Sequence, residues 1–244
     1  NREVDSAVVN SYENCAFVGT DAPEAGHMQG KMIGDFLVAN FDTVDLNGDG
    51  KISYVMFKGQ EGNAEAEYRT QYAVEDADAI LTEAGKEPLS YYAGDDVATK
   101  YLVDQNGTWS SAAAVAYMDT ILAEYSEANG NMIELVIANN DDMALGAIDA
   151  LKAQDMLENG PVVVGVDGTL AALEAIQNGE MLGSVVNDAQ LQAQAMLDIA
   201  CALTEGSDPQ QVVEGMNGQY VRAPHRIVTK ENVGQEIAYL TQSE

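Results

Sequence analysis

The segment 45–53 carries oxygen-bearing side chains at alternate positions around a glycine-assisted turn. Hard cations prefer oxygen ligands, and calcium loops place them at the first, third, fifth, seventh and ninth positions, with a glycine at the sixth. Gly50 stands at that sixth position. The candidate ligands are Asp45, Asn47, Asp49, the main-chain carbonyl of Lys51, and Ser53. The segment therefore predicts a calcium site.

The twelfth position separates this loop from an EF-hand. An EF-hand has a bidentate glutamate there, whereas this chain has Met56. Residues 52–57 are mostly β-branched or aromatic, so a strand is expected after the loop in place of a helix. The closing carboxylate must then come from elsewhere in the chain. Glu134 begins another apolar run, and parallel pairing of the two strands would bring its carboxylate to the loop, which makes it the candidate closing ligand.

A second group of polar residues follows the ends of apolar, strand-like runs. Asn63, Asn140, Asp167 and Asn187 each stand at or just after such an end. Each of them alone is an ordinary turn or capping residue. Because parallel α/β sheets bind ligands at the carboxyl ends of their strands, the set together predicts a polar crevice.

Glu65, Arg69 and Trp109 each have two interpretations. Glu65 and Arg69 lie four residues apart, so they form either an ion pair on a solvated helix face or part of the crevice. Trp109 precedes a predicted helix, where it either fastens the helix to the core or stacks on a ligand. Amides, carboxylates, an arginine and one aromatic ring suit a neutral polyol, whose hydroxyls need both donors and acceptors.

A strand followed by a helix recurs at least five times along the chain. The predicted strands cover residues 15–19, 52–58, 134–138, 161–166 and 181–186, with extended segments at 88–93 and 219–228. The predicted helices cover residues 20–40, 64–84, 110–127, 143–157, 170–178, 190–203 and 231–240. Strands rich in valine and isoleucine predict an α/β fold whose parallel sheet has helices on both faces. Gly26, Gly30 and Gly34 form a smooth stripe that is expected to pack against this sheet.

Composition limits the possible partners. A chain of 244 residues with 46% hydrophobic content can bury a substantial core. Its formal charge of −29 argues against nucleic acid and anionic membrane surfaces, because their phosphates would be repelled. The sequence has no apolar run long enough to predict a membrane span. Cys15 and Cys201 are expected to be isolated buried thiols in preference to a disulfide.

The chain resembles the periplasmic galactose/glucose-binding proteins of bacterial ABC sugar transport and chemotaxis. The similar segments are the calcium loop and residues 58–70, 133–144, 165–167 and 185–188, in the family's order, and the resemblance covers essentially the whole chain. It implies a type I periplasmic-binding-protein-like α/β fold, largely the C-terminal lobe, that binds a galactose-like or glucose-like hexose and is not an enzyme. It also implies that Glu134 completes the calcium site. The sugar-contacting positions that it implies are Asn1, Asn63, Glu65, Arg69, Trp109, Asn140, Asp167 and Asn187.

Departures from the family pattern are expected to change the site. Asn63 and Glu65 replace the usual histidine and aspartate, so the hydrogen bonds to the sugar must be rearranged. Ser53 stands where a longer amide is frequent, so a water is expected to mediate that calcium contact. Most strand–helix units of the family's first lobe, including an aromatic residue that covers the sugar, have no counterpart in the sequence. The cleft is therefore expected to be impaired in a truncated form.

The missing units define the expected domain organisation. Residues 1–19 and 188–218 are expected to be remnants of the first lobe, 20–187 the sugar-binding lobe with the calcium loop, and 219–244 the hinge return and terminal segment of that lobe. The chain begins at Asn1 without a signal-like segment, so it is expected to be a cut product. The helix over 190–203 is expected to expose an apolar face through which the chain self-associates.

The resemblance implies a monosaccharide ligand, with an ABC permease and a chemoreceptor as partners. It implies a periplasmic or extracellular location, with a lipid anchor in the missing N-terminal part. The alternative is the sugar-sensing effector domain of a transcription regulator, which shares this architecture, although the acidic charge and the lack of a basic helix-turn-helix disfavour it. An enzyme is not expected, because the sequence has no nucleophile elbow, phosphate loop or metal-histidine cluster.

Overall fold

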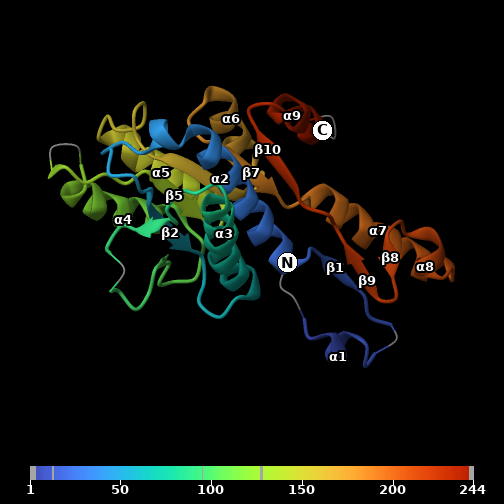
Figure 1. The fold of residues 1–244 in the computed structure, drawn as a ribbon. Coiled ribbons are helices and arrows are strands. Elements are labelled where there is room, and N and C mark those ends of the chain that lie inside the picture. The colour runs from blue at the N-terminus through green and yellow to red at the C-terminus, as the bar shows by residue number, and fades with distance from the viewer. Residues whose placement is uncertain (1–3, 13, 95, 127–128, 242–244) are drawn as a thin grey trace.

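The computed structural model describes residues 4–12, 14–94, 96–126 and 129–241. Here the chain forms a large body around a seven-stranded sheet and a smaller body around a three-stranded sheet (Figure 1). The large sheet has the order β10-β7-β6-β5-β2-β3, and β4 also pairs with β2. Its strands are β2 (Ser53–Lys58), β3 (Ser90–Tyr91), β4 (Leu102–Val103), β5 (Leu135–Ala138), β6 (Val162–Asp167), β7 (Gly183–Val186) and β10 (Arg226–Thr229). Its pairs are parallel except β10 with β7, which confirms the predicted α/β class.

Helices cover both faces of the large sheet. Successive strand side chains point to opposite faces, so Phe57 belongs to one apolar core and Met56 to the other. On the Met56 side lie α2 (Ala22–Val44) and α3 (Ala64–Glu83). On the Phe57 side lie α4 (Ser111–Glu124), α5 (Asp141–Ala153), α6 (Leu170–Asn178) and α9 (Val233–Thr241). Both cores contain completely buried side chains, so the sheet is closed off from solvent on its two faces.

The glycine stripe of α2 packs against a helix, so its expected packing against the sheet is wrong. A Cβ atom at Gly26 would lie 2.5 Å from the carbonyl oxygen of Tyr68, and one at Gly30 would lie 2.6 Å from that of Tyr72. Both carbonyls belong to α3. The stripe therefore allows α2 and α3 to approach backbone to backbone, and it thereby sets the position of α3 over the sheet.

The smaller sheet has the order β1-β9-β8. Its strands are β1 (Phe17–Gly19), β8 (Met216–Asn217) and β9 (Tyr220–Arg222), accompanied by α1 (Ser6–Val9), α7 (Ala189–Glu205) and α8 (Pro209–Val212). Ala195 and Ile199 of α7 form its small buried core with Val213 and Val221. The chain crosses between the two sheets at residues 20–21, 187–188 and 223–225, so β9 lies in the small sheet and β10 in the large one.

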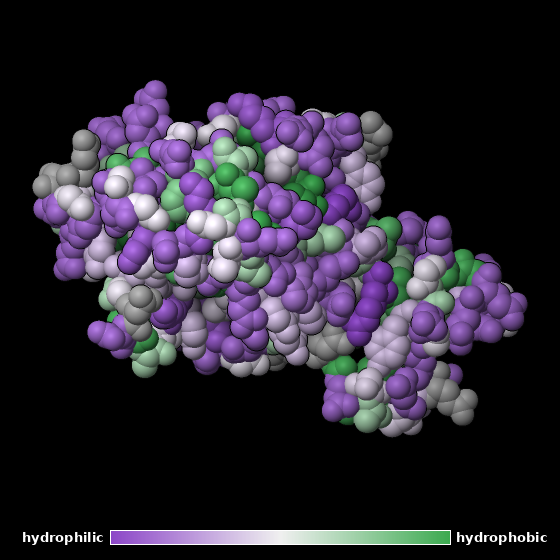
Figure 2. Space-filling model, in the orientation of Figure 1, coloured by the Kyte–Doolittle hydropathy of each residue, from purple (hydrophilic) through white to green (hydrophobic). Residues whose placement is uncertain are grey.

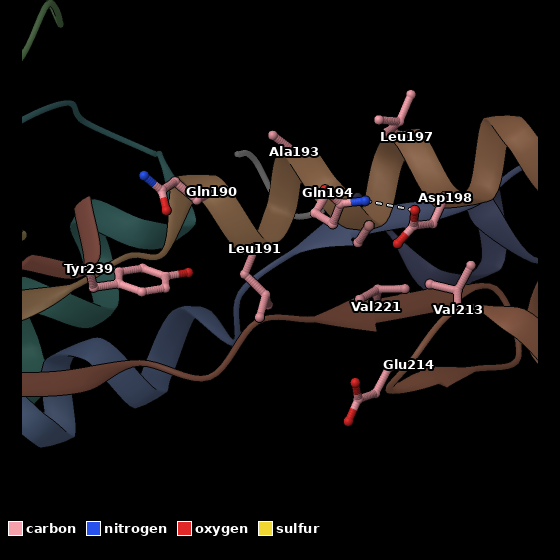
Figure 3. Close-up of a pocket in the computed structure, with 11 residues that line it drawn as sticks. Gln190, Leu191, Ala193, Gln194, Leu197, Asp198, Val213, Glu214, Val221 and Tyr239 are labelled. Carbon is pink, nitrogen blue, oxygen red and sulfur yellow. Dashed lines mark hydrogen bonds between the residues drawn. The ribbon is translucent and has the colours of Figure 1, made fainter. Parts of the chain in front are cut away.

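Helix α7 exposes several large apolar side chains, as predicted for the helix over 190–203. Its exposed side chains include Leu191, Met196, Leu197 and Leu203, and Leu197 is 57% exposed. A groove of about 660 Å³ lies between this helix, the small sheet and Tyr239 of α9. In Figure 3, Leu191 points from α7 toward the strand below, whereas Leu197 points away from it. Elsewhere the face drawn in Figure 2 is mainly hydrophilic, in keeping with the acidic composition.

Several local predictions need correction. The helix expected to end near residue 40 continues to Val44, with a non-helical residue at Asn40. Cys201 is exposed on α7 and Cys15 is half-buried, so the expected burial is wrong for Cys201; both thiols are free. The elements α1, α8, β4 and β8 escape prediction because they are too short for a periodic pattern. Among the described helices, none is both long and apolar enough to cross a membrane.

Candidate functional site

The predicted sugar-contacting residues gather at one edge of the large sheet. Asn63 follows β2 and caps α3, and Asn140 follows β5 and caps α5. Asp167 ends β6, and Asn187 follows β7. These strands are consecutive neighbours in the sheet, so their carboxyl ends lie side by side along one end of the sheet. Asn1, the remaining predicted position of the first lobe, lies outside the described residues.

Arg69 links several of these residues. Its Nη2 lies 3.2 Å from Oε2 of Glu65, and its Nη1 donates to the carbonyl oxygen of Asn139 at 2.9 Å. Nη1 also lies 3.7 Å from Oδ1 of Asp167. The Glu65 and Arg69 side chains are 6% and 4% exposed, so the interpretation as a solvated surface pair is wrong. The buried Nε of Arg69 has no hydrogen-bond partner among the described protein atoms, which leaves one donor for a further group.

Trp109 lies beside Arg69, with the guanidinium 5.8 Å from its ring centroid. The indole covers Gly59 so closely that a Cβ atom there would lie 2.0 Å from the ring, so glycine is required at that position. Trp109 has a positive φ of 58°, and its carbonyl oxygen accepts a hydrogen bond from Nδ2 of Asn140 at 3.2 Å. This half-buried ring therefore stands at the crevice and also packs against the turn after β2.

Asp167 and Asn187 line a cavity of about 350 Å³ at the same edge. The Asp167 side chain is about one-third exposed. Burial raises its pKa, while the Arg69 guanidinium and a hydrogen bond from Asn187 lower it in part. The carboxylate therefore interacts with an arginine and an amide and still has surface that faces solvent, which is the state required of a ligand-binding acceptor.

Asn63 is held in its turn by its own amide. Its Oδ1 accepts from the main-chain N–H of Glu65 at 3.0 Å, and its Nδ2 donates to Oε1 of Gln60 at 3.1 Å. The same turn is fastened by Lys58, a buried residue that sequence analysis missed. Its Nζ lies 3.1 Å from Glu61 and 2.8 Å from Glu67. Lys58 therefore fixes the turn that carries Asn63.

Asp104 is a second residue that sequence analysis missed. Burial opposes its ionisation, but main-chain donation from Ser110 and Asn106, with the hydroxyls of Thr108 and Ser110, lowers its pKa to about 2. The ionised carboxylate ties the loop before Trp109 into one conformation. An aspartate followed at short spacing by Asn106, Thr108 and Ser110 is the sequence signal that could have identified it.

Glu134 meets the predicted calcium loop. Its Oε1 accepts from the main-chain N–H of Leu46 at 2.8 Å, and its Oε2 accepts from that of Ser53 at 2.7 Å. This approach follows from the parallel register of β2 and β5, which pairs Tyr54 with Leu135 and so sets the two preceding residues side by side. Burial raises the pKa of Glu134, and these N–H donors oppose the rise.

The loop itself is organised by hydrogen bonds to its predicted ligands. Asp45 accepts from the N–H groups of Asp49 and Gly50, and Asn47 also accepts from Asp49 at 3.0 Å. Asp49 accepts from the N–H of Lys51 at 2.9 Å, and the Ser53 hydroxyl donates to Met132. No group of three or more His, Cys, Asp or Glu side chains in the described chain is arranged to hold a metal. The oxygen donors of the loop and Glu134 nevertheless fit calcium by chemical type, and they lie around one turn.

Residues 3–208 match the periplasmic binding protein domain family, and the chain belongs to that family. It is 34% identical over 235 residues to the D-galactose/methyl-galactoside binding periplasmic protein MglB of Haemophilus influenzae. That alignment covers 96% of this chain and 64% of the relative, so the chain spans less than two thirds of the relative's length.

Solved structures with the same fold match nearly the whole of this chain. An ABC transporter solute binding protein from Bacillus halodurans, solved with bound myo-inositol, is 26% identical with a TM-score of 0.66, covering 98% of this chain and 67% of that one. A twin-arginine translocation pathway signal protein from Burkholderia phytofirmans is 25% identical with a TM-score of 0.69, covering 94% and 61%. The relatives with an assigned role are binding proteins, in agreement with the expectation that the chain is not an enzyme.

Proposed function

We propose that this chain binds a hexose of the galactose or glucose type, as part of a solute-binding protein of an ABC transporter. The observation that carries the proposal is the arrangement around Arg69, where carboxylates, amides and an indole meet at the ends of neighbouring parallel strands. A sugar presents hydroxyls that donate and accept, together with an apolar C–H face that stacks on an aromatic ring. The crevice offers a partner for each of these features.

The proposed ligand class agrees with the relatives. MglB is named for D-galactose and methyl-galactoside, and the Bacillus halodurans protein was solved with myo-inositol. These ligands are neutral cyclic polyols of similar size. Asn63 and Glu65 differ in length from the histidine and aspartate expected in the family. They would therefore give this chain its own preference among hexoses.

The proposed partners follow from the transport role. Binding of the sugar would draw the two bodies together about the crossing segments, and the closed form would be presented to an ABC permease or a chemoreceptor. The protein would act in the periplasm or outside the cell, where a lipid anchor would hold it near the permease. The transcription-regulator alternative is not retained, because MglB and the Bacillus halodurans protein are binding proteins and no observation favours a regulator.

A structural calcium ion is part of the proposal. Asp45, Asn47, Asp49, Lys51 through its carbonyl, Ser53 through a water, and Glu134 would hold it. The ion would neutralise the carboxylates that crowd this turn. It would also join the start of β2 to the start of β5, at the edge of the sheet opposite the crevice, so its role would be to clip the two strands together.

Isothermal titration calorimetry with D-galactose, D-glucose, D-xylose and myo-inositol tests the proposal, with the Haemophilus MglB protein as the positive control. We expect the chain to bind a hexose weakly, with a Kd on the order of millimolar, because the first lobe contributes few contacts. Asp167→Ala should weaken binding roughly tenfold or more, since it removes a charged acceptor. Asp149→Ala, an exposed acid on α5, is the matched control and should bind normally. Absence of binding to every sugar by the parent chain would contradict the proposal.

A further inference from the structure

Asp141 is a completely buried carboxylate next to the crevice that does not reach the crevice surface. It is the first residue of α5, directly after Asn140. Burial, followed by repulsion from Asp167, raises its pKa to about 7. A buried acid of this kind lowers stability unless its hydrogen bonds compensate, so its partners indicate what it does.

One oxygen of Asp141 binds the turn that follows β6 directly, and the other binds it through Ser184 of β7. Its Oδ2 accepts from the main-chain N–H of Thr169 at 2.7 Å, and its Oδ1 accepts from the Ser184 hydroxyl at 2.7 Å. The same hydroxyl oxygen accepts from the N–H of Gly168 at 3.1 Å. Gly165 leaves the space that the carboxylate occupies, because a Cβ atom there would lie 2.4 Å from Oδ1. Asp141 and the fully buried Ser184 thus bind two successive N–H groups of one turn.

The turn held in this way contains strained backbone. Asp167 has a φ of 125° and Gly168 a φ of 73°. Glycine adopts such values readily, but a positive φ at an aspartate costs free energy and persists only where the surroundings impose it. The two bound N–H groups belong to the residues directly after Asp167. This conformation directs the Asp167 carboxylate toward Arg69, whose Nη1 lies 3.7 Å away.

We propose that Asp141 and Ser184 are positioning residues that hold residues 167–169 in the strained turn and so aim the Asp167 carboxylate into the crevice. The proposal rests on the proposed function only in that Asp167 is taken to contact the sugar. Neither residue touches the ligand, because both side chains are completely buried. Their effect on binding must therefore pass through Asp167.

Amide hydrogen exchange and NMR on the full chain test the positioning without any sugar. Ser184→Ala and Asp141→Ala should raise the exchange rates of the Gly168 and Thr169 amides at least tenfold and shift the Asp167 carboxyl carbon resonance. Asp141→Asn should preserve the exchange rates, because its amide can accept from Thr169 and donate to Ser184. The Val136 amide in β5 is the internal control, and Asp149→Ala is the control variant. If Ser184→Ala does not fold, Ser184→Cys fills the same space with a weaker donor.

A coupling experiment then tests the consequence for binding. Ser184→Ala should weaken D-galactose binding at least fivefold in the parent chain and less than twofold in an Asp167→Ala background, because the residue it positions is then absent. Equal weakening in the two backgrounds, or unchanged exchange at Gly168 and Thr169, would overturn the proposal. If exchange and the Asp167 resonance change as expected while the parent chain binds none of the sugars, the positioning is supported and the proposed function fails.

Discussion

The two bodies of this molecule differ in how completely their sheets are covered. Phe57, Ile137 and Val136 in the large sheet are fully buried, and helices pack on both of its faces. In the small sheet α7 provides a modest core around Ile199, while Leu197 on the same helix is 57% exposed. A sheet needs an apolar layer on each hydrophobic face to be stable. The candidate site and the predicted calcium loop both lie on the body that meets this need.

Polar contacts hold the two bodies together at the crossing segments. Arg222 donates to the carbonyl oxygen of Thr20 at 2.7 Å, and Nδ1 of His225 lies 2.8 Å from Glu24. Arg226 contacts Asp188 at 2.7 Å. Hydrogen bonds with Glu236 and then Asp188 raise the pKa of Arg226, and the Leu191 N–H together with Arg226 lowers the pKa of Asp188 against the effect of burial. The links between the bodies are therefore polar, whereas an apolar core holds each body together internally. Because helices cover the large sheet on both faces and the small sheet is covered less completely, we expect the large body to be rigid and the small body to move more easily relative to it.

A matched pair of core substitutions should give the largest difference in stability between the two bodies. Ile137→Ala in the large sheet should lower the free energy of unfolding by about 2–5 kcal/mol, because it leaves a cavity in a closed core. Ile199→Ala in the small body should cost clearly less, since its surroundings are partly open and can relax. Denaturant unfolding followed by circular dichroism measures both. Equal losses would show that the small body is as well supported as the large one.

Titration of Asp141 should make the stability of the large body depend on pH. An unfolded aspartate titrates near about 3.9, whereas burial raises the pKa of Asp141 to about 7. Between these two pH values the folded state holds a proton on Asp141 that the unfolded state has lost. The stability that this proton contributes is fully present below the unfolded pKa and is lost as the pH rises through the folded pKa. The charged group that acts on Asp141 is Asp167. Arg69 and Asp142 act in turn on Asp167.

The variant Asp141→Asn has no proton to lose at this position. It should be more stable than the parent at pH 8, by at most on the order of 4 kcal/mol, and the difference should shrink toward about pH 4. Thermal melts across this pH range measure the effect, with Asp149→Asn as an exposed control on the same helix. A stability difference that does not vary with pH would contradict the assignment.

Calcium should also act on the large body alone. Binding to the folded state raises its stability by about 3 kcal/mol at a hundredfold excess over Kd, so calcium should raise the Tm and chelation should lower it. The calcium-dependent part of the shift should fall more in Glu134→Ala than in Ser53→Ala, because the glutamate offers two oxygens. Glu83→Ala, an exposed acid outside the loop, is the control. Equal effects of the first two variants would exclude Glu134 as the closing ligand.

The smallest expected effect on stability concerns the exposed face of α7. Leu197→Glu should change the free energy of unfolding by less than about 0.5 kcal/mol, because the side chain is already exposed. We expect the parent chain to self-associate through this face and the variant to shift toward monomer in sedimentation velocity. Val38→Glu, on an exposed position of α2 in the large body, should leave association unchanged. A parent chain that is monomeric at all concentrations would refute this expectation.

Local patterns in the sequence determined much of the large body. The helix over 170–178 was predicted with the bounds it has, and Asn63 and Asn140 stand at helix starts as their capping chemistry indicates. These features depend on neighbours within a few residues, where periodicity and hydrogen bonding to the nearest backbone decide the outcome. The order of polar residues along the chain therefore indicated a crevice without any knowledge of distances.

Only the tertiary structure decided which of these residues meet. The register of β2 and β5 brings Glu134 to the predicted calcium loop, and the approach of α3 to β6 sets Arg69 beside Asp167. The packing of the glycine stripe against α3 depends on which helix faces meet, and so does the burial of Asp141. Those contacts join segments that are far apart in the chain. Long-range register and packing minimise the free energy of the whole fold, so they leave no signature in a short window of sequence.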